Sequence, residues 1–115
     1  MTHSGGCHCG RIAFDVEMDL GKVISCNCSI CTKRGYLLAF APADKVTLRT
    51  PESDMSTYTF NTHRIRHLFC PTCGVGPLGR STSPEGVDTF AINVRCLDGV
   101  DLAALDIQPH DGRSS

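Results

Sequence analysis

Cys7-His8-Cys9-Gly10 is a short stretch near the start of the chain that carries a pair of thiols followed by a glycine. A second pair, Cys70-Pro71-Thr72-Cys73-Gly74, follows much later. The glycine after each pair can adopt a positive φ, which turns backbone amides toward the sulfurs. Two such pairs typically supply the four thiolates of a structural zinc site, which would link the first strand to a distant hairpin. The predicted ligands are Cys7, Cys9, Cys70 and Cys73.

A third group of cysteines occurs in Cys26-Asn27-Cys28-Ser29-Ile30-Cys31, and no glycine follows it. Catalytic zinc is held by three protein ligands, and its fourth position is left to water or substrate. Because the other two pairs already complete one site, we predict a second, catalytic zinc in this loop. The predicted ligands are Cys26, Cys28 and Cys31.

Two other interpretations of the three-cysteine loop remain open at this stage. The loop could form a closed structural site or a metal-free redox cluster. Cys96 is the candidate for a fourth ligand of a closed site, and it could equally be a small apolar residue of the core.

The eight cysteines also bear on the cellular compartment. Residues 1–6 contain no basic segment followed by an apolar run, so we expect no secretory signal. No apolar run approaches the ~20 residues needed to span a bilayer. We therefore expect a cytoplasmic protein, in which paired cysteines bind metal or catalyse rather than form disulfides.

The composition predicts one domain, residues 1–115, with a modest core. The chain has a mass of 12.4 kDa, no Trp and only 6% aromatic residues, so bound metal would help to stabilise it. A net charge of -1 provides no basic field for nucleic acid or an anionic membrane. We expect neither as a partner, and the sequence does not predict the oligomeric state.

Short strands dominate the predicted secondary structure. Ile12, Phe14 and Val16 alternate with polar residues, which predicts a half-buried strand at residues 11–17. We expect residues 22–26 to pair with it, and the apolar run at residues 36–41 to form a buried strand. Further strands are predicted at residues 46–49, 56–60, 65–69 and 89–94, turns at 74–79, and a helical turn at 101–105 capped by Asp101. This pattern indicates an all-β fold, either a sandwich or a folded-over sheet, with little helix.

Histidines and cations give weaker signals. His63 and His67 would share one face of a strand with Ile65, which favours exposed or hydrogen-bonded histidines over metal ligands. Several cations could hold the carboxylates of a small anionic thiol, or they could be ordinary solvated surface charges. These cations are Lys33, Arg34, Arg64, Arg66, Arg80 and Arg95.

Together, these motifs resemble the glutathione-dependent formaldehyde-activating enzyme family, which also includes centromere protein V. The resemblance extends over residues 4–112 and rests on four motifs in order. They are Cys7-His8-Cys9-Gly10, Cys26-Asn27-Cys28-Ser29-Ile30-Cys31, Phe69-Cys70-Pro71-Thr72-Cys73-Gly74 and Asn93-Val94-Arg95-Cys96-Leu97-Asp98-Gly99. It implies a β-tent of folded-over antiparallel sheets and two zinc ions per chain, one structural and one catalytic, on the ligands named above.

The resemblance also implies a reaction. In the founding activity of the family, glutathione and formaldehyde combine to S-(hydroxymethyl)glutathione, in the class of carbon-sulfur lyases. An open three-thiolate zinc could accept the substrate thiol and lower its pKa. We therefore expect a zinc enzyme of this type that uses glutathione or a similar small thiol. The alternatives are a non-catalytic zinc module that binds a protein partner and a thiol redox protein.

Overall fold

The computed structural model describes residues 1–60, 64–83 and 85–111, so His63 lies outside the described part. Within these residues the chain forms ten strands, one α-helix and four 3₁₀ turns. The strands are β1 (Thr2–Gly6), β2 (Ala13–Glu17), β3 (Lys22–Cys26), β4 (Leu38–Pro42), β5 (Val46–Leu48), β6 (Ser56–Tyr58), β7 (Ile65–Phe69), β8 (Leu78–Thr82), β9 (Asp88–Asn93) and β10 (Asp106–His110). The helix is α1 (Ser29–Arg34), and the turns are η1 (Ala43–Lys45), η2 (Glu52–Asp54), η3 (Val94–Cys96) and η4 (Leu102–Ala104).

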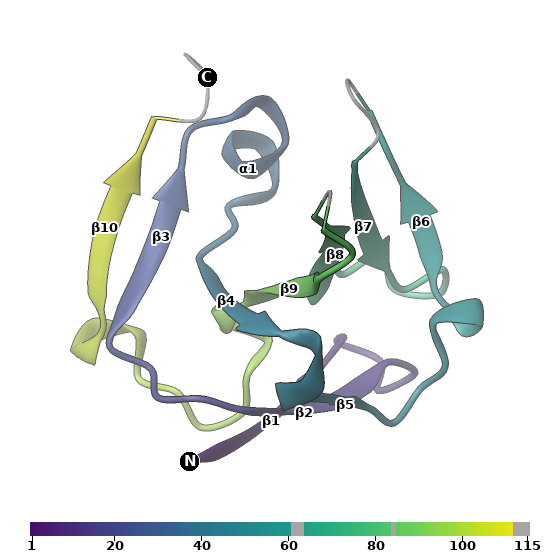
Figure 1. Ribbon diagram of the computed structural model, residues 1–115. Coiled ribbons are helices and arrows are strands. Elements are labelled where there is room, and N and C mark those ends of the chain that lie inside the picture. Colours follow the sequence, from purple (N-terminus) through teal and green to yellow (C-terminus); the bar gives the residue numbers. More distant parts are fainter. Residues whose placement is uncertain (61–63, 84, 112–115) are drawn as a thin grey trace.

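The strands form two sheets, which confirms the predicted all-β fold. One sheet has the order β1-β2-β5, and the other has the order β10-β3-β4-β9-β8-β7-β6. Neighbouring strands are antiparallel except β10 and β3, which run parallel. In Figure 1 the seven-stranded sheet folds over, with β10 and β3 on one side, β6 and β7 on the other, and β4 and β9 between them. The smaller sheet lies beneath this fold.

The core fills the space between the two sheets. Phe14 and Val16 of β2 are fully buried, as the alternating sequence predicted, together with Ile92 of β9. The strand predicted at residues 36–41 differs from expectation, because it is not buried on both faces. Ala39 and Ala41 face the core, whereas the side chain of Phe40 is 56% exposed on the other face of the sheet.

The predicted pairing of residues 22–26 with residues 11–17 is wrong. β3 pairs with β10 and β4, whereas β2 pairs with β1 and β5. β1, β8 and β10 were not predicted. β1 is rich in small polar residues, and every residue of β10 is exposed. The predicted turn at 74–79 also overlaps the start of β8. Without alternating apolar residues, the sequence of these strands contains no period to detect.

The helix α1 converts part of the predicted three-cysteine loop into regular structure. Gly35 ends it with a left-handed φ of 68°, and its N–H donates to the carbonyl of Cys31 at 2.8 Å. A helix of one and a half turns is unstable alone, so its buried residues Ile30 and Cys31 must hold it in place. The predicted turn at 101–105 is confirmed as η4, where Asp101 Oδ1 accepts a hydrogen bond from Ala103 N–H at 3.1 Å.

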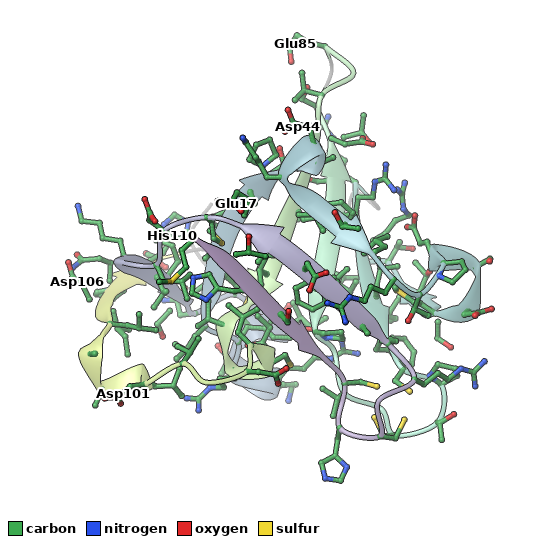
Figure 2. The ribbon with its side chains drawn as sticks, turned by 90° about the horizontal axis from the view of Figure 1, so that it is seen from below. Glu17, Asp44, Glu85, Asp101, Asp106 and His110 are labelled. Atoms are coloured by element: carbon green, nitrogen blue, oxygen red, sulfur yellow. The ribbon has the colours of Figure 1, made fainter. Side chains whose placement is uncertain are left out.

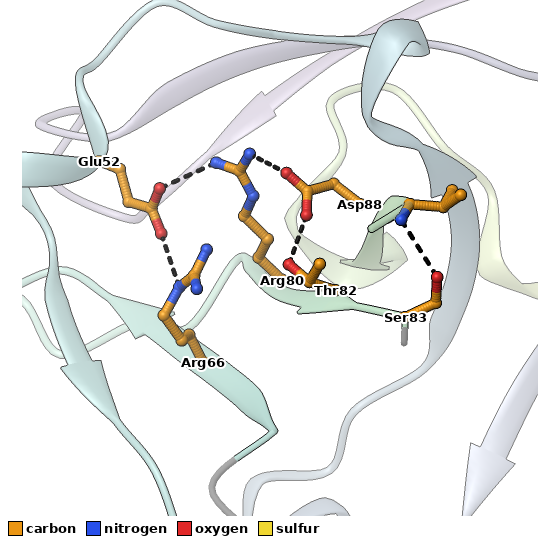
Figure 3. A network of polar contacts seen from close by, with 7 residues as sticks. Glu52, Arg66, Arg80, Thr82, Ser83 and Asp88 are labelled. Carbon is orange, nitrogen blue, oxygen red and sulfur yellow. Dashed lines mark hydrogen bonds and ion pairs between the residues drawn. The ribbon is translucent and has the colours of Figure 1, made fainter. Parts of the chain in front are cut away.

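A network of charged residues lies on β7, β8 and β9 and reaches η2 (Figure 3). Arg66 and Arg80 are directly opposite one another across β7 and β8, an arrangement that is unfavourable for like charges. Glu52 offsets the repulsion by accepting from both, at 3.2 and 3.0 Å. Arg80 also pairs with Asp88, and the hydroxyl of Thr82 together with this guanidinium lowers the pKa of the Asp88 carboxyl.

No helix within the described residues is both long enough and apolar enough to cross a membrane.

Candidate metal centres and the adjoining cavity

The four-cysteine cluster forms where the loop after β1 meets the loop after β7. Its four sulfur atoms, from Cys7, Cys9, Cys70 and Cys73, all lie within 4.8 Å of one another, and Figure 2 shows sulfur atoms gathered at this junction. The sulfur of Cys9 is 3.7 Å from that of Cys7 and 3.6 Å from that of Cys70. These distances are too long for a disulfide of about 2.05 Å. They match the edge of about 3.8 Å expected for a tetrahedron with zinc-sulfur bonds of about 2.3 Å.

Backbone amides point at these sulfurs, as the two glycines predicted. Gly10 and Gly74 have φ values of 86° and 81°. The N–H of Ile12 donates to Cys7 Sγ at 3.2 Å, and that of Thr72 donates to Cys70 Sγ at 3.3 Å. Burial alone would raise the pKa of the Cys70 thiol, but amides of Cys73 and Thr72 outweigh burial and lower this pKa to about 6. Cys70 is therefore prepared to supply thiolate, the form that binds metal, whereas at Cys9 the Arg11 amide is outweighed by burial and the neighbouring thiols, which raise the pKa of Cys9 to about 11.

The three-cysteine cluster is formed at the junction of β3 and α1. Cys26 ends β3, Cys28 precedes α1, and Cys31 lies within the helix, with the three sulfurs within 4.8 Å of one another. Burial raises the pKa of the Cys31 thiol. Burial also opposes ionisation of Cys28, yet the Cys31 amide and the neighbouring thiols outweigh it and lower the Cys28 pKa. This cluster can also hold a metal ion, whose positive charge would favour ionisation of Cys31.

Cys96 does not complete the three-cysteine cluster, which corrects the interpretation of Cys96 as its fourth ligand. Among the described residues, no other Cys, His, Asp or Glu joins those three sulfurs. Burial raises the pKa of the Cys96 thiol to about 11, and so do the charges of Cys7 and Cys73. Cys96 therefore lies near the four-cysteine cluster, with its carbonyl oxygen next to Gly5 of β1.

A cavity of about 480 Å³ adjoins the three-cysteine cluster and is lined by all three cysteines. None of the four cysteines of the other cluster lines it. The cavity occupies the face of the seven-stranded sheet that is opposite to the core, and alternate residues of β3, β4, β7 and β9 point into it. Ile24 of β3, Phe40 of β4, Ile65 of β7 and Ala91 of β9 are examples.

His67 is a cavity residue that sequence reasoning missed. The sequence predicts that His67 and Ile65 share one face of β7. In the structure, both residues of that face line the cavity. Its ring stacks on Phe60, with centroids 5.5 Å apart. Burial lowers the pKa of His67, and the positive charge of Arg34 lowers it further. The imidazole is therefore predominantly neutral at neutral pH, and the alternation of β7 was the one signal that could have located it.

The predicted cations divide into separate groups. Lys33 and Arg34 line a hollow of about 300 Å³ that shares Ile30 and Phe60 with the cavity. Arg34 also donates to the hydroxyl of Tyr36 at 2.7 Å.

Three of the other predicted cations do not line this hollow. Arg95 donates to the carbonyl of Gly35 at 3.1 Å and lines a separate hollow behind the three-cysteine cluster. Arg66 and Arg80 pair with Glu52 on the sheet face opposite to the cavity, and neither lines the cavity or the hollow beside it.

Comparison with known proteins agrees with this geometry. Residues 2–110 match the family model described as glutathione-dependent formaldehyde-activating enzyme. The fold is also similar to the crystal structure of a Rhodobacter sphaeroides protein that was a structural genomics target. The two chains are 27% identical with a TM-score of 0.75, over 91% of this chain and 99% of that one. The chain therefore belongs to the glutathione-dependent formaldehyde-activating enzyme family.

Proposed function

We propose that this protein is a zinc-dependent enzyme of the carbon-sulfur lyase type, which joins a small thiol to an aldehyde as S-(hydroxymethyl)glutathione synthase does. The observation that supports this proposal is the contrast between the two clusters. The three-cysteine cluster borders a cavity large enough for a substrate, whereas the four-cysteine cluster links two loops and does not line that cavity.

In this proposal the two clusters hold zinc for different purposes. Cys7, Cys9, Cys70 and Cys73 hold a structural ion, and Cys26, Cys28 and Cys31 hold the second ion with three thiolates. When bound, the second ion supplies a fourth coordination position for a substrate sulfur and lowers the pKa of that thiol.

The reaction itself is a reversible addition. One carbon-sulfur bond forms between the thiol and the carbonyl carbon, the carbonyl becomes a hydroxyl, and the thiol proton moves to that oxygen. Nothing is oxidised or reduced. The imidazole of His67 is suited to accept the proton and to return it to the oxygen, since its ring lies in the cavity wall and is neutral.

The thiol partner is anionic in this proposal, and glutathione is the expected example. Lys33 and Arg34 line the hollow next to the cavity, where they can hold carboxylates while the sulfur reaches the three-cysteine cluster. Arg34 is already oriented by its hydrogen bond to Tyr36, so little side-chain freedom is lost when it binds.

A pair of cysteine variants tests the proposal. Wild-type protein is expected to contain two zinc ions per chain by elemental analysis. Cys28→Ser should lose one zinc and reduce adduct formation to the uncatalysed rate while the far-ultraviolet circular dichroism spectrum is unchanged. Cys73→Ser should prevent folding, because it breaks the structural site. Equal unfolding of both variants would contradict the separate roles.

Thiol binding has its own test, which uses cobalt-substituted protein. The visible spectrum of the cobalt form should change on addition of glutathione, and the change should disappear in Cys28→Ser. A spectrum that does not respond to glutathione in the wild type would contradict an open three-thiolate site.

A further inference from the structure

The cavity beside the three-cysteine cluster has a strongly apolar wall. Among the described residues that line it, none is Lys, Arg, Asp or Glu. Ile24, Leu38, Phe40, Phe60 and Ile65 project hydrocarbon into it from four different segments. Phe40 is 56% exposed and Ile65 is 46% exposed, although both would gain stability from burial. Exposed apolar side chains gathered around one hollow indicate a binding surface for an apolar ligand.

This wall suits neither substrate of the founding family reaction. Glutathione carries two carboxylates and an ammonium group, and placing them against hydrocarbon would remove their hydration, while the described lining holds no Lys, Arg, Asp or Glu to pair with them. Formaldehyde is about as small as a water molecule, which occupies about 30 Å³ in the liquid. A cavity of about 480 Å³ is far larger than formaldehyde requires.

The volume instead matches a larger organic group. An apolar protein cavity of about 150 Å³ already binds benzene, and the cavity here is about 480 Å³. The backbone of β8 keeps this space free at Gly79, which is directly opposite His67. A side chain at Gly79 would begin 3.7 Å from Ile65 Cγ2 and 3.9 Å from His67 Nδ1, and would grow into the space between them.

We infer that the aldehyde partner of this enzyme is neutral and carries an apolar substituent, an aromatic ring or a medium-length alkyl chain, which occupies this cavity. The inference rests on the proposed function for its reaction, and it changes the carbonyl partner from formaldehyde to a larger aldehyde. The substituent packs on Phe40 and Ile65, and the carbonyl oxygen turns toward His67, a polar side chain in that wall. The anionic thiol approaches from the adjoining hollow, where Lys33 and Arg34 lie.

The six isoleucines of the chain provide a direct test. Ile24, Ile30 and Ile65 line the cavity, whereas Ile12, Ile92 and Ile107 do not. Protein with ¹³C-labelled isoleucine methyl groups is titrated with benzyl alcohol, an unreactive probe that cannot form imines with lysine. Glutathione is titrated separately. Two results together support the inference. Benzyl alcohol should shift the methyl signals of Ile24 and Ile65 saturably. Glutathione should shift only the methyl signal of Ile30, because Ile30 also borders the hollow with Lys33 and Arg34.

Matched variants complete the test. Ile65→Ser should weaken benzyl alcohol binding on the order of tenfold, because it removes apolar contact from the cavity wall. Ile107→Ser is the control, since Ile107 is 44% exposed, close to the 46% of Ile65, but lies outside the cavity. It should leave the affinity unchanged. Phe40→Ser should act like Ile65→Ser, which guards against a local folding defect in one variant.

Several results would overturn the inference. The first is that benzyl alcohol shifts no isoleucine signal, or shifts all six equally. The second is that glutathione shifts Ile24 and Ile65 more than benzyl alcohol does. The third is that Ile65→Ser and Ile107→Ser weaken benzyl alcohol binding equally. Failure of the proposed function gives a different result. In that case benzyl alcohol binds as expected, but wild type and Cys28→Ser form the thiol adduct at the same rate, and the apolar preference of the cavity stands.

Discussion

Individual side chains near the two clusters differ in how readily they change protonation. The amides around Cys70 lower its pKa to about 6, whereas burial raises the pKa of Cys31. His67 is kept neutral because its burial and the charge of Arg34 both disfavour the imidazolium. Each of these effects comes from groups within a few ångströms, so single substitutions can test them.

The first prediction concerns the pH dependence of stability at His67. Its folded-state pKa is lowered, so the unfolded chain binds more protons once pH falls below the unfolded value of about 6.5. Stability should therefore be complete above that value and decrease as pH falls toward the folded-state pKa. His67→Gln should show a smaller decrease in urea midpoint between pH 7.5 and pH 5.5 than the wild type.

His110→Gln is the control for this prediction, because His110 lines the same cavity but is exposed. A change in His110→Gln as large as that in His67→Gln would show that the effect does not come from the buried ring of His67. If His67→Gln and wild type lose the same stability over this range, His67 does not titrate as the structure implies.

At the scale of elements, the approach of β1 to its neighbours depends on two glycines. A Cβ atom at Gly6 would lie 2.0 Å from the carbonyl oxygen of Ile12, and one at Gly5 would lie 2.4 Å from that of Cys96. Both clashes are with backbone, which cannot move aside as a side chain can. These contacts position the loop that carries Cys7 and Cys9, so the packing of β1 bears directly on the four-cysteine cluster.

Gly6→Ala should therefore destabilise the protein by about 1–3 kcal/mol, the usual effect of overpacking. The measurement is the free energy of unfolding in urea on zinc-loaded protein. Gly21→Ala is the matched control, since a Cβ there meets nothing within 4 Å and the backbone is not left-handed. That change should be neutral or slightly stabilising. Similar losses in both variants would show that the close approach of β1 does not limit stability.

Much of the secondary structure was predictable from sequence, and β1 and β10 were missed for one shared reason. β2 alternates between buried and more exposed residues, and this period of two was visible in its sequence, while β5, β6, β7 and β9 were recognised as short runs of strand-forming residues. β10 is exposed at every residue and β1 is built from small polar residues. Their pairing comes from backbone hydrogen bonds to β3 and β2, which any sequence can supply.

On the scale of the whole molecule, the four-cysteine cluster connects the two sheets. Cys7 and Cys9 follow β1 of the smaller sheet, whereas Cys70 and Cys73 lie between β7 and β8 of the larger one. Structural zinc binding contributes about 10–16 kcal/mol in small zinc domains. This equals or exceeds the total stability of about 5–15 kcal/mol that is typical of folded domains.

Removal of zinc by a chelator should therefore unfold the protein at room temperature, seen as loss of the β-sheet signal in circular dichroism. Cys28→Ser, which is expected to keep only the structural ion, should unfold on chelation in the same way. A wild-type protein that stays folded with no measurable zinc would contradict the structural role of this site.

The sequence by itself identified the cysteine motifs, because the cysteines within each motif lie two or three residues apart and a glycine follows both pairs of the four-cysteine cluster. It also determined the all-β class, since alternation is a local property. Only the tertiary structure decided the apolar cavity, the place of His67 in its wall and the position of Cys96 near the four-cysteine cluster. These features bring together residues from distant strands, and only the folding of the seven-stranded sheet fixes which of their faces meet.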